Sequence, residues 1–234
     1  MLEQTLRSGF TELSLPLDEQ ALRRYRIYHD RLAETNKVMN LTAIEGEDEI
    51  ARLHFLDSAA LLNCADLRGA RVIDVGTGAG FPGLALKIAM PDLSLVLLDS
   101  LDKRIGFLRE TSLALGFPDV DCVHARAEEA PAEYRGAFDL AVSRAVARLN
   151  ILCELCLPLV KTGGLFLAMK GPDHADELKE ASRAIRLLGG ELESERDYTV
   201  PGTDVVHSVI LIRKVSDTPP KYPRRWAQIK KQPL

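Results

Sequence analysis

Residues 74–83 have the sequence DVGTGAGFPG, which contains four of the sixteen glycines of the chain. A β-rich run, ARVIDVG, leads into this stretch, and a helical run, PGLALKIAM, follows it. Glycine allows a backbone to turn sharply and to approach a ligand closely. A strand, a glycine loop and a helix in this order are typical of a nucleotide or nucleoside site in an α/β sheet.

The alternation of strand-like and helix-like runs continues along the chain. Strands that alternate with helices predict a parallel sheet with helices on both faces. Two β-rich runs close the pattern, and their short connection favours an antiparallel pair. We therefore predict an α/β, Rossmann-like fold with a seven-stranded, mostly parallel sheet. The expected strands after the first are at 93–99, 120–125, 137–144, 164–171, 190–200 and 207–215.

Three segments are expected from the pattern and the charge. Residues 1–68 have helical periodicity and predict a helical cap, in which Asp18 caps a helix. Residues 69–214 carry the strand–helix alternation. Residues 215–234 contain four prolines, which predicts an extended or loosely ordered tail. Residues 213–234 hold seven Lys or Arg and one Asp, although the whole chain has a net charge of −4. A basic tail on an acidic body indicates contact with a polyanion, or else a solubilising tail.

The position of the glycines distinguishes between two kinds of ligand. The first turn glycine after the strand is Gly76, so Asp74 lies inside the strand, two residues earlier. A carboxylate there would repel a pyrophosphate, but it would favour a sulfonium or an amino group. Asp99 ends the next strand 23 residues after Gly76, near the spacing of a ribose-hydroxyl acceptor. Asp99 is also a candidate cap for the helix that follows. No GK[ST] follows the glycines, which excludes a P-loop.

The four cysteines predict free thiols rather than a disulfide or metal framework. Cys153 and Cys156 form a single CxxC in an apolar helical run, which favours packing in a core. Cys122 and His124 share a face of a strand, but two ligands are too few for a site, so no metal is predicted. The chain begins without an apolar signal segment and has no run long enough to cross a bilayer. We therefore expect a cytoplasmic protein without membrane contact.

Eight short motifs are spread over nearly the whole chain. They are NLTAI (40–44), HFLDS (54–58), VIDVGTGAGFPG (72–83), LLDSLDKRIGFL (97–108), RAEE (126–129), SRAVARL (143–149), GGLFLAMKG (163–171) and TPPKYPRRWAQIKKQPL (218–234). Together they resemble those of the bacterial RsmG (GidB) methyltransferases. The FPG ending of the glycine loop, the SLDKR run and the KYPRR tail are the most specific parts of the resemblance. In the tail, this chain has Trp226 and lacks a glycine that is usual there.

The resemblance implies a class I S-adenosylmethionine-dependent methyltransferase fold and an activity on 16S rRNA. The family transfers a methyl group from S-adenosyl-L-methionine to nitrogen 7 of guanine 527 in the 530 loop, and S-adenosyl-L-homocysteine is the product. The implied partner is 16S rRNA in the 30S subunit or in an assembly intermediate. No obligate protein partner is inferred, and a monomer is expected.

The resemblance also implies roles for single residues. Asp99 would hold the ribose, Ala127 and Glu128 would flank the adenine, and the glycine loop would line the methionine part. The full cofactor set is Asp74, Gly76, Thr77, Gly78, Gly80, Phe81, Asp99, Ser100, Ala127, Glu128 and Arg144. Arg144 and Lys170 are the candidate catalytic residues. The candidate RNA-binding residues are Arg126, Lys170, Lys221, Arg224, Arg225, Trp226, Lys230 and Lys231, and we expect the tail to act on RNA and not on the cofactor.

Guanine nitrogen 7 has a lone pair and no proton to lose, so a direct in-line transfer needs no general base. The sequence agrees, because no [ND]PP[YF] follows the fourth strand and no Pro-Cys nucleophile is present. We expect alignment of the reactants to carry catalysis. Two alternatives stay open at this point. A nicotinamide-dependent oxidoreductase is disfavoured by Asp74 and by the glycine positions, and a non-catalytic RNA-binding module would keep only the nucleoside pocket.

Overall fold

The computed structural model describes residues 1–144, 147–171 and 174–234. Ala145 and Val146 of the SRAVARL motif therefore lie outside the described residues. Within them the chain forms a seven-stranded sheet in the order β3-β2-β1-β4-β5-β7-β6. The strands are β1 (Arg71–Val75), β2 (Ser94–Asp99), β3 (Asp121–His124), β4 (Phe138–Arg144), β5 (Val160–Lys170), β6 (Gly190–Thr199) and β7 (Val206–Lys214).

The predicted topology is confirmed. Strands β1 to β5 pair in parallel, and β7 is antiparallel to both β5 and β6. Strand β5 begins at Val160, four residues earlier than the expected 164–171, because a short turn at Leu157–Leu159 ends the preceding helix. The strand order reverses between β1 and β4, and in α/β sheets a ligand site lies at such a point, beyond the carboxyl ends of the strands.

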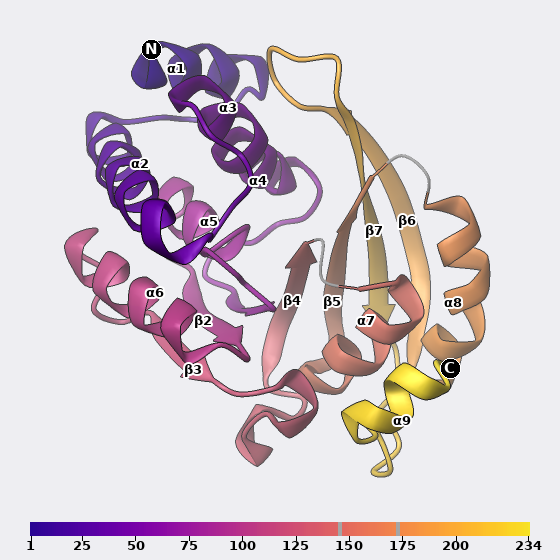
Figure 1. Cartoon of the computed structure of the whole chain (residues 1–234). Helices are drawn as coiled ribbons and strands as arrows, with labels where there is room; N and C mark the ends of the chain where they lie inside the picture. Colours follow the sequence, from indigo (N-terminus) through magenta and orange to yellow (C-terminus); the bar gives the residue numbers. More distant parts are fainter. Residues whose placement is uncertain (145–146, 172–173) are drawn as a thin grey trace.

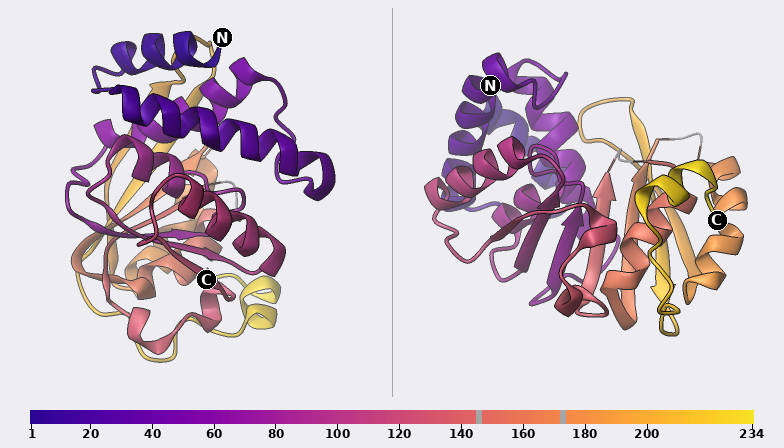
Figure 2. Two further views of the ribbon diagram at one scale, coloured as in Figure 1. Left: turned by 90° about the vertical axis from the view of Figure 1, so that its left-hand side faces the viewer. Right: turned by 60° about the horizontal axis from the view of Figure 1, so that its bottom comes forward.

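Helices cover both faces of the sheet (Figures 1 and 2). One face carries α7, α8 and α9, and the other carries α5, α6 and the N-terminal helices, because apolar strand residues alternate between two core clusters. The helices are α1 (Leu2–Glu12), α2 (Glu19–Met39), α3 (Glu47–Ile50), α4 (Asp57–Ala59), α5 (Gly83–Ala89), α6 (Asp102–Ala114), α7 (Leu149–Cys156), α8 (Ala175–Leu187) and α9 (Trp226–Lys231), and a helical turn, Ala51–Leu56, joins α3 to α4.

The N-terminal helices share one core with the sheet. Tyr25 and Tyr28 of α2 are fully buried, and their hydroxyls donate to the carbonyls of Ala85 (2.9 Å) and Ala79 (2.6 Å) near the glycine loop. The expected cap at Asp18 is confirmed, since its carboxylate accepts from the amide of Ala21 at 2.7 Å. The cap is therefore packed onto the face of the sheet that carries the loop, and the boundaries at residues 68 and 214 stay predictions.

The cysteines and the tail complete the second core. Cys153 and Cys156 are fully buried in it, and burial raises the pKa of both thiols, which confirms their expected place in a core. Tyr222 and Ile229 of the tail are buried in the same cluster, and the tail ends in helix α9. The tail is therefore not loosely ordered, because its apolar side chains have a place in the core. Residues 215–225 have no helix or strand, as expected of an extended segment, and the helix at 226–231 was not expected.

We predict that Gly83→Ala destabilises the fold. A Cβ at position 83 would lie 2.8 Å from Cβ of Asp74 and 2.9 Å from Cδ2 of Leu97, where helix α5 begins against the sheet. Overpacking of this kind costs about 1–3 kcal/mol. Gly106→Ala in α6 is the matched control, because its Cβ would meet nothing within 4 Å and alanine favours a helix by up to about 1 kcal/mol. Urea unfolding measures both, and equal midpoints for the two variants would contradict the prediction.

Candidate active site

Asp74, in strand β1, holds the glycine loop through two hydrogen bonds. Its Oδ2 accepts from the Thr77 hydroxyl (2.7 Å) and from the amide of Gly83 (2.8 Å). The carboxyl is completely buried, and burial raises its pKa to about 6, although these two hydrogen bonds oppose the shift. Gly76 makes the first turn with a φ of 71°, and its amide donates to the carbonyl of Leu98 at 2.9 Å. Asp74 thus fixes the shape of the loop.

Two pockets line up along the carboxyl ends of β1 and β2. The first, about 400 Å³, lies over the glycine loop and is lined by Gly76, Thr77, Gly78, Phe81 and Arg144 among others. The second, about 240 Å³, is lined by Ala127, Glu128, Leu155 and Trp226 among others. Gly76, Asp99 and Ser100 line both pockets, so the two form one trough with Asp99 at its centre. We refer to them as the loop pocket and the inner pocket.

Asp99 supports the backbone on both sides of the trough. Its Oδ2 accepts from the amide of Gly78 and its Oδ1 from that of Leu101, each at 2.9 Å. The alternative role of Asp99 as the N-cap of the next helix is wrong, since Leu101 is the N-cap of α6 and Asp99 accepts from the backbone amide of that residue, which precedes the first turn. Nη1 of Arg104 also lies 3.4 Å from Oδ2. Three donors still leave the carboxylate room for one more, because its oxygens offer about four acceptor positions. Asp99 can therefore hold the loop and a ligand hydroxyl together.

A buried ion pair closes the far end of the loop pocket. Nη1 of Arg144, at the end of β4, lies 2.8 Å from Oδ2 of Asp57 and also donates to the carbonyl of Leu53 at 3.1 Å. The side chain of Asp57 is 1% exposed and that of Arg144 is 16% exposed. The guanidinium also lies over the ring of Phe81, 5.1 Å from its centroid. The pair therefore joins the HFLDS segment, β4 and the glycine loop.

The last two strands supply further donors to Asp57. Its Oδ1 accepts from the Tyr198 hydroxyl of β6 and from Nδ1 of His207 of β7, both at 2.7 Å. Burial tends to raise the pKa of Asp57, but the His207 hydrogen bond and the Arg144 charge outweigh it and lower the pKa. The same hydrogen bond raises the pKa of His207. Asp57 is thus a carboxylate engaged by three side chains.

His54 is held as a neutral ring. Nη2 of Arg144 lies 2.9 Å from Nδ1 of His54, and a guanidinium only donates, so Nδ1 accepts and the proton is on Nε2. Nε2 is 2.8 Å from the hydroxyl of Thr42. Burial and the Arg144 charge lower the pKa of His54 to about 3. The ring stacks on Phe81 with centroids 4.3 Å apart, so it fixes the glycine loop from the side of the cap.

A third pocket, of about 470 Å³, opens on the other side of this cluster. We call it the base pocket. Ile44, Leu53, Met169 and Val205 give it a largely apolar lining. His54 and Arg144 line both this pocket and the loop pocket, so the two are neighbours. Lys170 also lines the base pocket, where its ammonium lies 2.7 Å from Oε2 of Glu177 and donates to the carbonyl of Ala147.

Most of the expected cofactor residues come together in the trough, and two do not reach its lining. Asp74 lies beneath the loop, and a Cβ on Gly80 would meet the Tyr28 hydroxyl at 2.3 Å, so this glycine faces the cap. The contacts of these two residues with a cofactor stay predictions. The expected residues that line the trough are Gly76, Thr77, Gly78, Phe81, Asp99, Ser100, Ala127, Glu128 and Arg144, and Arg126 lies at the inner pocket.

The contacts of the tail go beyond the expected ones in two respects. Arg224 forms an ion pair with Glu154 of α7, which is fully buried, with Nη2 to Oε2 at 2.6 Å and Nε to Oε1 at 2.8 Å. The charge of Arg224 is therefore paired within the protein, and its contact with a phosphate stays a prediction. Trp226 lines the inner pocket beside Gly76, so the tail lies next to the trough and not apart from it. Lys221, Arg225, Lys230 and Lys231 are exposed, as expected of residues that bind RNA.

Sequence reasoning did not assign roles to Thr42, His54, Asp57, Tyr198 and His207. The only signal was that NLTAI and HFLDS belong to the motifs that carry the resemblance, because these contain Thr42, His54 and Asp57. Tyr198 and His207 lie in β-rich runs that indicate only strands. The contacts of all five residues join parts of the chain that are distant in sequence.

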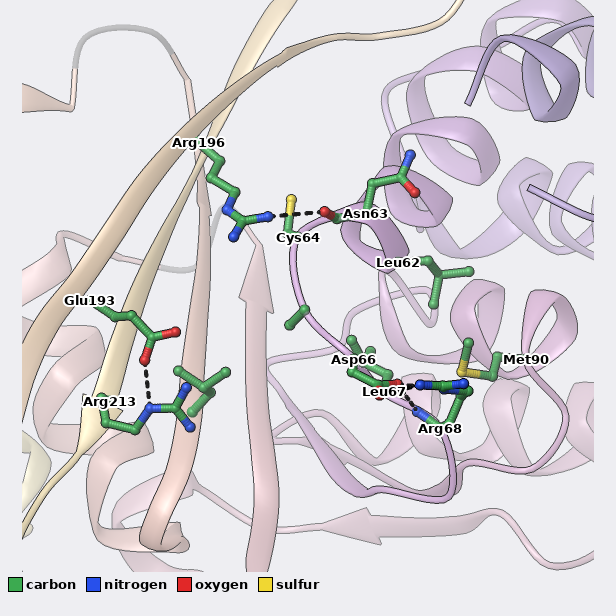
Figure 3. A pocket seen from close by; sticks show the side chains of 12 residues that line it. Leu62, Asn63, Cys64, Asp66, Leu67, Arg68, Met90, Glu193, Arg196 and Arg213 are labelled. Atoms are coloured by element: carbon green, nitrogen blue, oxygen red, sulfur yellow. Dashed lines mark hydrogen bonds and ion pairs between the residues drawn. The ribbon is translucent and has the colours of Figure 1, made fainter. Parts of the chain in front are cut away.

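A larger hollow, of about 550 Å³, lies away from this cluster (Figure 3). Its charged side chains are engaged within the protein, since Arg213 bonds Glu193 at 2.5 Å and Arg68 bonds Asp66 at 2.6 Å. Arg196 donates to the carbonyl of Asn63 at 3.1 Å, and Figure 3 shows it reaching across the hollow from β6. The trough and the base pocket, in contrast, converge on one buried cluster, so we take them as the functional site.

The fold and the trough define a class I S-adenosylmethionine-dependent methyltransferase. TrmN from Thermus thermophilus superposes with a TM-score of 0.57 at 25% identity and covers 77% of this chain and 53% of its own. Geranyl diphosphate C-methyltransferase from Streptomyces coelicolor, whose structure contains S-adenosyl-L-homocysteine, has a TM-score of 0.58 at 12% identity, over 81% of this chain and 98% of its own. At that identity the second likeness shows the fold alone.

The particular family follows from the sequence comparisons. Residues 21–199 match the family model of rRNA small subunit methyltransferase G. Ribosomal RNA small subunit methyltransferase G of Alkaliphilus metalliredigens is 46% identical over 98% of this chain and 97% of its own, and that of Alkaliphilus oremlandii is 45% identical over 100% and 99%. The chain belongs to this family, which makes it an S-adenosylmethionine-dependent rRNA methyltransferase. Among the described residues, no helix is long and apolar enough to cross a membrane.

The trough fits the cofactor of this class on its own chemistry. The side chain of Glu128 is 4% exposed, and its Oε1 has no hydrogen-bond partner among the described residues. A buried acceptor of this kind requires a hydrogen-bond donor from a ligand, and the amino group of adenine can be that donor. Asp99 keeps acceptor capacity near the middle of the trough. The residues therefore match a nucleoside with hydroxyl and amino donors.

We predict that His54 makes the fold sensitive to acid. The unfolded ring binds a proton below pH 6.5, whereas the folded ring does not until about pH 3. The unfolded state therefore binds more protons between these values, and stability falls as the pH falls through this window. His54→Gln removes this dependence. Urea unfolding should show the stability of the wild type falling relative to the variant by up to about 1.4 kcal/mol per pH unit from 6.5 downwards.

His207→Gln is the matched control for this prediction. The pKa of His207 is raised, so its stabilisation is fully present below pH 6.5 and is lost as the pH rises through the folded pKa. The difference in stability between wild type and variant should therefore change below pH 6.5 for His54→Gln and above pH 6.5 for His207→Gln. A His54→Gln variant whose stability follows the wild type in parallel from pH 6.5 to 4 would contradict the neutral, buried ring.

Proposed function

We propose that the protein methylates nitrogen 7 of guanine 527 in the 530 loop of 16S rRNA. Membership of the family supports a methyltransferase that acts on small-subunit rRNA. One observation carries the finer assignment to nitrogen 7. The base pocket next to the loop pocket contains a carboxylate, Asp57, that is already engaged by Arg144, Tyr198 and His207. Because this carboxylate is engaged, it is not free to accept a proton from the substrate. A target atom that has no proton to lose, such as nitrogen 7, therefore suits this pocket.

The trough supplies the residues that would hold the cofactor. The loop pocket would take the methionine part, Asp99 the ribose, and the inner pocket the adenine between Ala127 and Glu128. When bound, S-adenosylmethionine supplies a methyl group on a sulfonium, which is an electrophile. Because Arg144 and His54 line both the loop pocket and the base pocket, the methyl group and the guanine would meet beside them.

Catalysis in this proposal rests on alignment and on a dry pocket. The lining of the base pocket is largely apolar, which excludes water from the approach. Holding two reactants in line is worth up to about 7–11 kcal/mol. Arg144 orients the base or a phosphate and does not bond nitrogen 7, because a donor there would occupy the lone pair that attacks. Lys170 lines the same pocket, paired with Glu177, and would contact the RNA there.

The surface cations extend this site toward the RNA. Arg126 lies at the inner pocket with half of its side chain exposed, and Lys221, Arg225, Lys230 and Lys231 are exposed on the tail. These residues would contact phosphates. We place the protein in the cytoplasm as a monomer that acts on the 30S subunit or on an assembly intermediate, without an obligate protein partner.

The proposal is tested with 16S rRNA that carries either guanine or 7-deazaguanine at position 527. 7-Deazaguanine replaces nitrogen 7 by a C–H group and keeps the exocyclic amine. We expect the purified protein to transfer a methyl group to the guanine RNA only, with 7-methylguanosine identified by mass spectrometry. Each RNA is assayed free and assembled into 30S subunits, so that the preferred substrate state is measured in the same experiment. Equal methylation of both RNAs, or of neither, would contradict the proposal.

The tail cations give a second prediction. Replacing Lys230 and Lys231 by Ala removes two phosphate contacts, so the slope of log affinity against log salt for RNA binding should become shallower by about 1.4 to 1.8. Arg183→Ala with Arg186→Ala on the exposed side of α8 is the control, because it removes the same charge from a different surface. Filter binding at several salt concentrations measures the slopes. The same slope for wild type and tail variant would show that these lysines do not contact RNA.

A further inference from the structure

Trp226 is part of a binding pocket although it lies in the tail. It is the first residue of α9 and lines the inner pocket together with Asp99 at the end of β2, Glu128 after β3 and Leu155 of α7. Its indole is partly buried and packs against the second core cluster. All the other residues that line the inner pocket lie between residues 75 and 155, and Trp226 is the one lining residue that comes from the tail.

The position of Trp226 is fixed by a buried ion pair two residues before it. Glu154 of α7 is 0% exposed and accepts from Arg224 through both oxygens, and its Oε1 also accepts from the backbone amide of Arg224 at 2.8 Å. Ile229, one turn after Trp226, is fully buried. Figure 2 shows α9 on the face of the sheet that carries α7. The chain is thus anchored just before Trp226 by Arg224 and just after it by Ile229, and these two contacts hold the indole at the pocket.

The pocket combines an aromatic face with an unpartnered acceptor. Oε1 of Glu128 is buried without a hydrogen-bond partner, and the nearest cation, Nη1 of Arg126, is 3.9 Å away. Val75, Leu98 and Leu155 give the remaining lining an apolar character. A flat heterocycle with an amino group fits this combination, because aromatic rings pack against bases and a buried acceptor needs a donor.

From this we infer that Trp226 is a wall of the adenine site and that cofactor binding and the docking of the tail depend on each other. The inference rests on the proposed placement of the adenine in the inner pocket. Adenine would pack against the indole while its amino group is in reach of Glu128. A ligand that binds only the state in which α9 is docked stabilises that docking, and the docking in turn raises the affinity for the ligand.

The coupling gives the tail a role beyond contact with phosphates. Lys230 and Lys231 are exposed on the same short helix that begins with Trp226. This helix therefore carries residues for each substrate of the enzyme, the indole for the cofactor and the two lysines for RNA.

The test uses the fact that Trp226 is the only tryptophan of the chain. Its fluorescence is recorded while S-adenosylhomocysteine, adenosine or methionine is added to the whole protein, and calorimetry measures binding of S-adenosylhomocysteine in parallel. We expect S-adenosylhomocysteine and adenosine to change the emission of Trp226, and methionine to leave it unchanged. Binding of S-adenosylhomocysteine by calorimetry without a change in emission would overturn the inference.

Variants give a readout that does not depend on fluorescence or on activity. Trp226→Ala should weaken binding of S-adenosylhomocysteine about 10-fold, whereas Trp226→Phe should keep it within about 3-fold, because base–aromatic packing survives in the second variant. Gln228→Ala, on the exposed side of the same helix, should bind as the wild type does. Wild-type affinity in Trp226→Ala contradicts this inference alone. A wild-type protein that does not bind S-adenosylhomocysteine contradicts the proposed function as well.

Discussion

The ion pair between Arg144 and Asp57 is the contact on which the site depends. It joins the end of β4 to the first residue of α4, within the HFLDS motif, and it is almost completely buried. Removing one partner of such a pair costs about 3–5 kcal/mol, because the remaining charge is left in a poorly solvated place. Tyr198 and His207 bring β6 and β7 to the same carboxylate. The N-terminal helices are therefore part of the candidate active site and not an accessory layer.

The same cluster gives the glycine loop its rigidity. Phe81 lies between the rings of His54 and Tyr28, with centroid distances of 4.3 and 5.2 Å, and under the guanidinium of Arg144. Asp74 holds the other end of the loop from inside the sheet. A loop fixed at both ends keeps its backbone in place before a ligand arrives, which reduces the ordering that binding requires. Preorganisation of this kind is what an alignment mechanism without a general base needs.

The sequence predicted the sheet well, because strand and helix periodicities are local. The antiparallel last pair, the cap at Asp18 and the core position of Cys153 and Cys156 all followed from neighbouring residues. The strand order is long-range, and its prediction came from the resemblance to methyltransferase sheets. The contacts that make the site are long-range, and they were not predicted. Asp57 meets partners 87 and 150 residues away, and Arg224 meets one 70 residues away.

The tail shows most clearly what composition leaves out. Four prolines and seven cations in 22 residues indicate an extended, charged segment, and counting charges treats each cation as free. Glu154 lies in an apolar helical run, and nothing around it in sequence indicates that it takes up the charge of Arg224. Trp226 could be recognised as an aromatic stacking residue, but the pocket it lines is visible only once α7 and the ends of β2 and β3 are assembled around it.

A crystal structure of the protein with S-adenosylhomocysteine tests the central claim most directly. The account places the homocysteine part in the loop pocket and the adenine in the inner pocket. The sulfur should then face the base pocket beside Arg144, where a methyl group could reach a guanine. A ligand bound outside the trough, or a sulfur turned away from the base pocket, would contradict the account.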